Sequence, residues 1–135
     1  MLKEFHWPVR VYYDDTDAGG IVYHANYLKM MEHARTEWLR QLGFEQDRLL
    51  AEQNRVFTVV SLEVNYLKPA RFNDALIATA SVGSIRPARL QFHQEVRRGD
   101  AVLCKAGVWI ACLKHPDMKP VRLPLRLVEE LTNGP

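Results

Sequence analysis

Two hydrophobic periods alternate along this chain and divide it into strands and one long helix. In residues 7–13, Val9 and Val11 alternate with a charged residue, and this pattern predicts a first strand. From 25 to 42 the apolar residues instead recur every three or four positions, which predicts an amphipathic helix about 27 Å long. Gly43 follows this segment and is typical of a helix C-terminus. The apolar stripe of the helix consists of Tyr27, Met31, Ala34, Trp38 and Leu42.

Four further strands are predicted after the helix, because the hydrophobic period returns to two. Residues 57–66 and 90–97 alternate between apolar and polar side chains. Residues 101–113 are apolar at almost every position, as in a central strand that is covered on both faces. Residues 98–100 have the composition of a hairpin turn. The remaining predicted elements are a strand at 75–85 and short helices at 46–53 and 125–131.

The order of these elements predicts the fold class. One strand, one long helix and four antiparallel strands form an α+β arrangement, in which a five-stranded antiparallel sheet buries one face against the helix. A length of 135 residues suits a single domain, 1–135. The other face and the edges of such a sheet still need cover, so we expect a dimer.

Composition and charge then narrow the class of protein. Hydrophobic residues make up 47% of the chain and charged residues 25%, which is ordinary for a globular protein. The net charge of +2 is too small to indicate a nucleic-acid partner. Residues 1–8 lack the apolar run of a signal peptide, and no segment approaches the length of a membrane span. We therefore expect a cytoplasmic protein with no transmembrane segment.

The two cysteines indicate the same compartment. Cys104 and Cys112 lie on one predicted strand, where eight residues separate them by about 26 Å. A disulfide needs Cα atoms within about 7 Å, so the two thiols cannot pair within the chain. No His or Cys stands beside them at metal-ligand spacing, and we interpret both as small core residues in a reducing compartment.

The residues best suited to catalysis lie between the first strand and the long helix. Residues 13–27 contain three carboxylates, two adjacent glycines and a histidine. This combination suits hydrolysis of an activated acyl group, because the acid attacks or activates water while free helix amides polarise the carbonyl. Two alternatives stay open for Asp14, Asp15 and Asp17. They cap a helix and solvate the loop, or they bind a cation, although the ligand spacing of a calcium loop is missing.

A motif at the start of the helix carries a family resemblance. Residues 17–27 read Asp-x-x-Gly-x-Val-Tyr-His-x-x-Tyr, and Glu-His-Ala-Arg-Thr-Glu follows at 32–37. Between one strand and four further strands, this arrangement resembles the hot-dog fold. More narrowly, it is similar to the hydroxybenzoyl-CoA thioesterase family and its bacterial branch associated with the Tol-Pal envelope system. The similarity runs from residue 7 to about 124. It implies a five-stranded antiparallel sheet wrapped around one long central helix, and an acyl-CoA thioesterase as the function.

The resemblance also implies roles for individual residues of the motif. The family's catalytic carboxylate falls on Asp17, which acts either as a nucleophile or as a general base for water. Gly19 and Gly20 let backbone and substrate approach closely. The amide of Tyr23 or of His24 is the implied oxyanion donor. The side chain of His24 either protonates the departing thiolate or hydrogen-bonds the loop as a structural group, and the side chain of Tyr23 either serves the site or packs.

Charged residues outside the motif are further candidates. Some hot-dog thioesterases use a glutamate on the central helix, which here is Glu32 or Glu37. Arg35 falls within the apolar sector of the helix. Because a buried arginine needs a carboxylate or backbone acceptors, we predict that Arg35 is paired, with Glu63 as the candidate partner.

The predicted reaction converts acyl-CoA and water into a free carboxylic acid and CoA, with no metal and no redox cofactor. CoA carries phosphates that need cations, and the resemblance places its nucleotide end at the turn that holds Arg86 and Arg89; an ordinary solvated surface is the alternative for these two residues. The resemblance implies a homodimer with two sites at its interface, or a homotetramer of two such dimers. It also implies acyl carrier protein as a partner. Two other functions stay open, a hot-dog hydratase or dehydratase and a non-catalytic protein that binds acyl thioesters.

Overall fold

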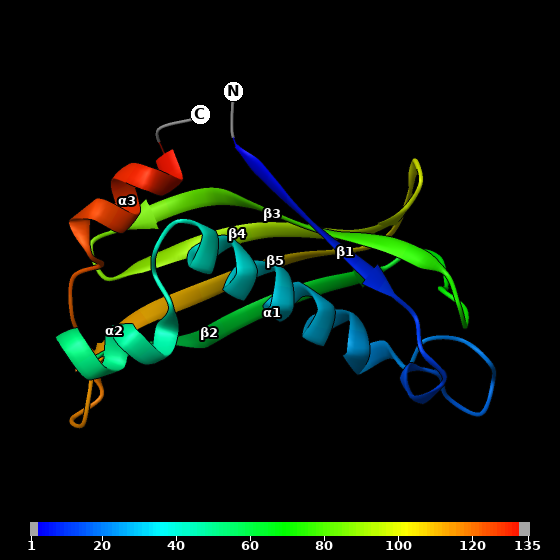
Figure 1. Ribbon diagram of the computed structural model, residues 1–135, viewed down its shortest axis with the longest axis horizontal. Coiled ribbons are helices and arrows are strands. Elements are labelled where there is room, and N and C mark those ends of the chain that lie inside the picture. Colours follow the sequence, from blue (N-terminus) through cyan, green and yellow to red (C-terminus); the bar gives the residue numbers. More distant parts are fainter. Residues whose placement is uncertain (1–2, 133–135) are drawn as a thin grey trace.

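An antiparallel sheet with the strand order β1-β3-β4-β5-β2 forms the framework of the computed structural model, which describes residues 3–132 (Figure 1). The strands are β1 (Glu4–Arg10), β2 (Arg55–Tyr66), β3 (Ala75–Arg86), β4 (Arg89–Arg98) and β5 (Ala101–Lys114), and a two-residue strand, β6 (Lys119–Pro120), pairs with β5. The helices are α1 (His24–Gln41), α2 (Gln46–Gln53) and α3 (Leu125–Thr132). The predicted α+β class and the five antiparallel strands are confirmed, and β6 is an addition.

The first strand begins and ends about three residues earlier than expected. β1 ends at Arg10, whereas the alternation of apolar residues continues to Val11. Val11 follows the last paired residue of β1: its N–H donates to the main-chain oxygen of Asp74 at 3.0 Å, its main-chain oxygen accepts the N–H of Asn73 at 2.9 Å, and a 3₁₀ turn follows at Tyr13–Asp15. Val11 is fully buried. At Val11 the alternation of apolar residues therefore indicates burial in the core, although the residue lies outside the strand.

Helix α1 lies across one face of the sheet and packs against β1, β3 and β4 (Figure 1). Trp38 is 2% exposed, and its ring lies 6.1 Å from that of Phe5 and 6.0 Å from that of Phe92. Of the predicted stripe only Leu42 remains partly exposed, since it caps the helix after the last full turn. Gly43 has a φ of 91°, the left-handed conformation predicted for the end of the helix. The buried residues of α1 are Tyr27, Met30, Met31, Ala34, Trp38 and Leu39.

Strand β2 ends the sheet on one side and exposes apolar side chains. Within residues 3–132 no strand pairs with its outer edge. Val59 and Leu62 pair with Ile110 and Val108 of β5, whose side chains lie under α1, so all four point to the helix side of the sheet. Even so, Val59 is 47% exposed and Leu62 is 43% exposed. The exposed apolar residues at this edge are Val59, Val60, Leu62, Tyr66 and Leu67.

The prediction that the two cysteines are unpaired core residues is confirmed. Cys104 and Cys112 both lie on β5 as free, fully buried thiols. Neither α1 nor any other helix of the described residues combines the length and the hydropathy that crossing a membrane requires.

Candidate functional site

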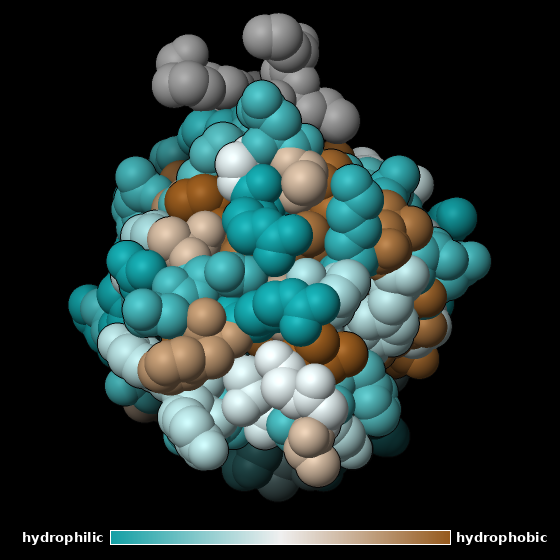
Figure 2. Space-filling view, turned by 90° about the vertical axis from the view of Figure 1, so that its right-hand side faces the viewer, coloured by the Kyte–Doolittle hydropathy of each residue, from teal (hydrophilic) through white to brown (hydrophobic). Residues whose placement is uncertain are grey.

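The connection between β1 and α1 forms a closed loop at one end of the sheet. In Figure 1 this loop lies at the right, and α2 and α3 lie at the left. Figure 2 faces the loop end of the molecule, where hydrophilic side chains surround smaller hydrophobic patches. Thr16 and Val22 pair in an isolated antiparallel bridge, and Gly20, with a φ of 82°, donates its N–H to the main-chain oxygen of Asp17 at 3.0 Å. A left-handed glycine therefore lets the chain reverse directly after Asp17.

The carboxylate of Asp17 is exposed and is oriented by one hydrogen bond. The N–H of Gly19 donates to Oδ1 of Asp17 at 2.8 Å. A Cβ at position 19 would lie 3.3 Å from that oxygen, so glycine leaves the carboxylate uncrowded. Within residues 3–132 no donor contacts the second oxygen, Oδ2. The loop thus fixes the direction of the carboxylate and leaves one oxygen available to a substrate.

The neighbouring aspartates have different roles. Oδ2 of Asp15 accepts the N–H of Tyr12 at 2.8 Å, which caps the 3₁₀ turn and not α1. Asp14 is exposed and makes no hydrogen bond within the described chain. The capping alternative therefore applies to Asp15, whereas the carboxylates of Asp14 and Asp17 are both exposed and cap no helix. No group of three His, Cys, Asp or Glu side chains within residues 3–132 is placed to hold a metal ion.

Helix α1 begins with two backbone amides that have no acceptor. The N–H of Tyr23 donates to the main-chain oxygen of Asp15 at 2.9 Å, so the expectation of a free Tyr23 amide is wrong. Tyr23 is the N-cap residue, and its extended backbone turns the N–H back into the loop. The amides of His24 and Ala25 have no acceptor within residues 3–132. They lie at the positive end of the helix dipole, where a developing oxyanion is stabilised.

A shallow, largely apolar pocket of about 290 Å³ adjoins His24. Tyr66, at the end of β2, donates its hydroxyl to the main-chain oxygen of His24 at 2.9 Å. Tyr27 lines the same pocket, and its hydroxyl accepts the N–H of Ala70 at 2.9 Å. Burial raises the pKa of the Tyr27 phenol, which therefore stays neutral. The contact of Tyr66 was not predicted, since in the sequence Tyr66 is only one more alternating residue of a strand.

The imidazole of His24 packs among aromatic rings. Its centroid lies 4.5 Å from that of Tyr23 and 6.2 Å from that of Tyr66. Within the described residues the ring makes no hydrogen bond, so the expected structural bond from this side chain to the loop is absent. The ring is exposed. It borders the pocket and is free to contact a bound molecule.

Arg86 and Arg89 lie at the far end of the sheet from Asp17. They pair across the turn between β3 and β4. The other end of β3, Ala75, pairs with Arg10 beside the Asp17 loop. Twelve residues of strand span about 36 Å, so one chain does not bring these arginines to its own Asp17. The guanidinium of Arg86 instead lies 5.5 Å above the ring of Trp109.

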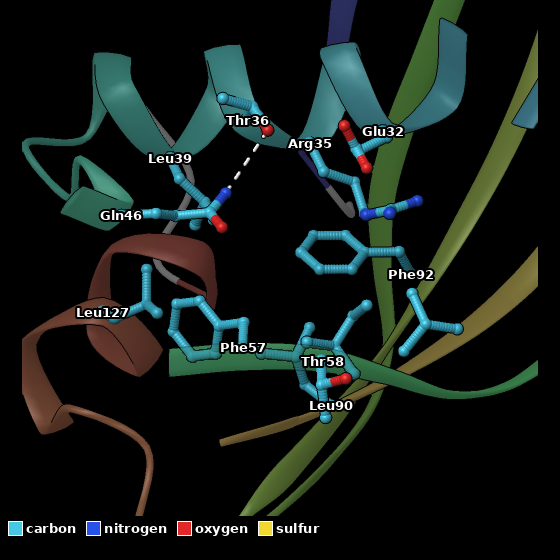
Figure 3. Close-up of a pocket in the computed structure, with 12 residues that line it drawn as sticks. Glu32, Arg35, Thr36, Leu39, Gln46, Phe57, Thr58, Leu90, Phe92 and Leu127 are labelled. Atoms are coloured by element: carbon cyan, nitrogen blue, oxygen red, sulfur yellow. Dashed lines mark hydrogen bonds between the residues drawn. The ribbon is translucent and has the colours of Figure 1, made fainter. Parts of the chain in front are cut away.

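A second pocket, of about 440 Å³, lies between α1, β2 and α3 (Figure 3). Glu32 and Arg35 project into it from α1, opposite an apolar wall that includes Phe57, Phe92 and Leu127 (Figure 3). Both helix glutamates lie away from the Asp17 loop. Glu32 is exposed, and Glu37 accepts a hydrogen bond from Arg40 at 2.8 Å.

The prediction that Arg35 is paired is confirmed, but the candidate partner, Glu63, is wrong. Its guanidinium donates to Oε1 of Gln94 at 2.8 Å, and Glu63 is exposed. Gln94 is 1% exposed and donates through Nε2 to the main-chain oxygens of Met31 and Thr79 at 2.9 and 3.1 Å. A neutral amide satisfies the arginine and the backbone together, which a carboxylate cannot do because it has no donor. Burial lowers the pKa of Arg35.

The family model described as "Thioesterase superfamily" matches residues 19–105 of this chain. That span contains both glycines and the start of α1 and begins two residues after Asp17. Two curated relatives match almost the whole chain. The acyl-CoA thioesterase YbgC of Haemophilus influenzae is 47% identical over 89% of this chain and 88% of its own. The acyl-CoA thioester hydrolase YbgC of Escherichia coli is 44% identical over 93% of this chain and 94% of its own.

Solved structures agree with this family. A probable thioesterase from Bartonella henselae has a TM-score of 0.85 at 33% identity, covering 92% of this chain and 100% of that chain. The 1,4-dihydroxy-2-naphthoyl-CoA thioesterase Slr0204 from Synechocystis has a TM-score of 0.88 over 96% of each chain. Its sequence identity is 21%, so this second likeness concerns the hot-dog fold alone.

Proposed function

Because this chain belongs to the thioesterase superfamily, we propose that it hydrolyses acyl-CoA thioesters at the loop around Asp17. One observation carries the placement of the site. A single closed loop presents an exposed carboxylate with one uncontacted oxygen, and it leads into a helix whose first amides, those of His24 and Ala25, have no acceptor within residues 3–132. The relatives called acyl-CoA thioesterases, at 44 and 47% identity, support the reaction class.

The chemistry follows from these two groups. The thioester carbonyl oxygen points to the amides of His24 and Ala25, where the negative charge that develops on it is stabilised. Asp17 then acts in one of two ways. As a nucleophile it attacks the carbonyl carbon, the C–S bond breaks, and water hydrolyses the resulting anhydride. As a general base it takes a proton from the water that attacks the carbonyl carbon, the C–S bond then breaks, and the proton passes to the departing thiolate. Both routes release a carboxylic acid and CoA.

Replacement of Asp17 by Asn tests the proposal. The amide keeps the size of the side chain but removes the negative charge, so kcat should fall about 10³-fold or more while the fold persists. We would measure thiol release from short aliphatic, long aliphatic and aromatic acyl-CoAs, with circular dichroism as the check on folding. Asp14→Asn is the matched control, since Asp14 is a solvated neighbour. Equal rates for wild type and Asp17→Asn would remove Asp17 from the mechanism.

We also propose that the protein is a homodimer that pairs through β2. The outer edge of this strand has no partner within residues 3–132, and five apolar residues on or beside it are 43–53% exposed. A two-fold axis at this edge pairs the two β2 strands antiparallel and covers these side chains. The Tyr66 end of each strand, which contacts His24, then lies beside the Arg55 end of its partner. Arg86 and Arg89 are also at this latter end of the sheet, so they serve the partner's Asp17 and not their own.

A further inference from the structure

The loop between β1 and α1 carries the candidate carboxylate but has little contact with the core. Of residues 12–25, Val22 alone is buried, at 2% exposed. Segments that bury few apolar side chains open at a low cost in free energy, so the position of this loop depends on its hydrogen bonds. The candidate site needs a fixed spacing between two segments, because Asp17 belongs to the loop and the free amides of His24 and Ala25 belong to α1.

Asn26 connects these two segments from the first turn of α1. Its half-buried side chain donates through Nδ2 to the main-chain oxygen of Asp15 at 2.9 Å. Asp15 lies two residues before Asp17, and Asn26 directly follows Ala25. Within residues 3–132 no other side chain of α1 hydrogen-bonds the loop. The contact therefore joins the segment that carries the carboxylate to the turn that carries the free amides.

The main-chain oxygen of Asp15 is shared by two donors that lie on either side of the free amides in the sequence. It also accepts the N–H of Tyr23 at 2.9 Å, and the N–H of Asn26 donates to the main-chain oxygen of Tyr23 at 2.8 Å. These three bonds close a ring whose chain segment includes His24 and Ala25. The bond from Tyr23 fixes this turn at one point only, whereas the second donor holds it from the other side.

We propose that Asn26 is a positioning residue for thioester hydrolysis, because it holds the loop on α1 so that Asp17 and the oxyanion amides meet the same thioester. Asparagine suits this role, since its short amide supplies a donor without a charge. An ionised aspartate of the same shape offers only acceptors, so it cannot bond the oxygen of Asp15, and it adds a negative charge near the developing oxyanion. This role rests on the proposed function, and Asn26 acts in it through the backbone of Asp15.

A hydrogen bond of this kind also stabilises α1, and the two effects differ in what the loss of the bond changes. Loss of a stabilising contact lowers the free energy of unfolding and leaves the geometry of the folded site as it was. Loss of alignment raises the barrier of the chemical step, since a misplacement of about 1 Å costs up to about 10²-fold in rate. Ground-state binding is then spared, so kcat falls while the affinity for the substrate stays the same.

Asn26→Leu removes the donor at nearly constant volume and introduces a better helix former. We expect kcat for acyl-CoA to fall about 30-fold, whereas the affinity for a CoA thioether with the same chain, measured by calorimetry, stays within about twofold of wild type. Asn26→Gln keeps an amide donor on a side chain one methylene longer and should recover most of the lost kcat. Thr79→Val is the matched control. It removes the hydroxyl that accepts the N–H of Glu95 at 3.0 Å, outside the loop, and should lower stability in urea with kcat unchanged.

A double-variant cycle tests whether Asn26 acts through Asp17. In the Asp17→Asn background, Asn26→Leu should lower the residual rate by less than about threefold, because a side chain that no longer reacts has no alignment to lose. An unchanged kcat in Asn26→Leu, an equal loss of affinity for the thioether, or losses that multiply in the double variant would refute the role of Asn26 and leave the proposed function standing. The same fall in kcat for Thr79→Val would assign the effect to stability and also refute this role. If wild type released no thiol, the proposed function and the role of Asn26 would fail together.

Discussion

At the scale of single residues, one backbone amide orients the candidate catalytic carboxylate. Gly19 donates to Asp17, whereas the carboxylate two positions earlier, Asp15, is used to cap the turn. The sequence shows three similar acids in four positions. Their difference arises from which backbone N–H each carboxylate meets, and this depends on the path of the loop.

Tyr66 links the start of α1 to the edge strand, and Tyr66→Phe tests that link. The change removes the hydroxyl that donates to His24, so we expect the free energy of unfolding to fall by about 1 kcal/mol. We also expect kcat to fall severalfold, because the first turn of α1 loses one of its supports. Urea denaturation and thiol release measure the two effects. Tyr13→Phe, which removes an exposed hydroxyl, should leave both values unchanged.

Cys104 makes stability depend on pH in the alkaline range. Burial raises the pKa of its thiol from 9.0 to about 11. Between these values the unfolded chain loses the thiol proton and the folded chain keeps it. Stability from this group is therefore complete below pH 9 and declines as pH rises toward 11. Cys104→Ala should flatten the curve over this range in denaturation experiments. A curve of unchanged slope would show that Cys104 is not the responsible group.

At the scale of elements, Gln94 ties α1 to the sheet. It accepts from Arg35 and donates to the main chain of both α1 and β3. Gln94→Leu should lower the free energy of unfolding by roughly 3 kcal/mol, because it leaves a largely buried guanidinium without an acceptor. The double variant with Arg35→Met should lose less than the sum of the single losses, since the stranded charge is then absent. Strict additivity would contradict this coupling.

The elements themselves were largely predictable. The bounds of α2 agree with the sequence pattern, and those of α1 and β3 agree within one residue. The reason is that hydrophobic periodicity, and for α1 the glycine at its end, Gly43, determine an element from residues that are close in sequence. The predicted end of β1 was wrong, because Val11 is buried but lies outside the strand. The predicted acceptor for Arg35, Glu63, was wrong as well. Gln94 lies 59 residues away, and no local pattern indicates which polar group will face a helix.

At the scale of the whole molecule, the exposed edge of β2 predicts a dimer that carries the activity. Leu62→Glu places a charge in the proposed interface, so we expect monomers in analytical ultracentrifugation and loss of most thioesterase activity. Ser61→Glu adds the same charge to the opposite face of the same strand and should preserve the dimer. A Leu62→Glu protein that remains dimeric would place the interface elsewhere.

The sequence by itself determined the antiparallel α+β architecture and the loop that contains the candidate carboxylate. Those features follow from periodicity and from glycines at sharp turns, which act over a few residues. Only the tertiary structure decided that Asp15 caps a turn, that Tyr23 has no free amide, and that Tyr66 supports His24. It also placed Arg86 and Arg89 about 36 Å from the Asp17 loop along β3. Which hydrogen bonds form, and which charges face each other, depends on groups that meet only when distant segments pack together.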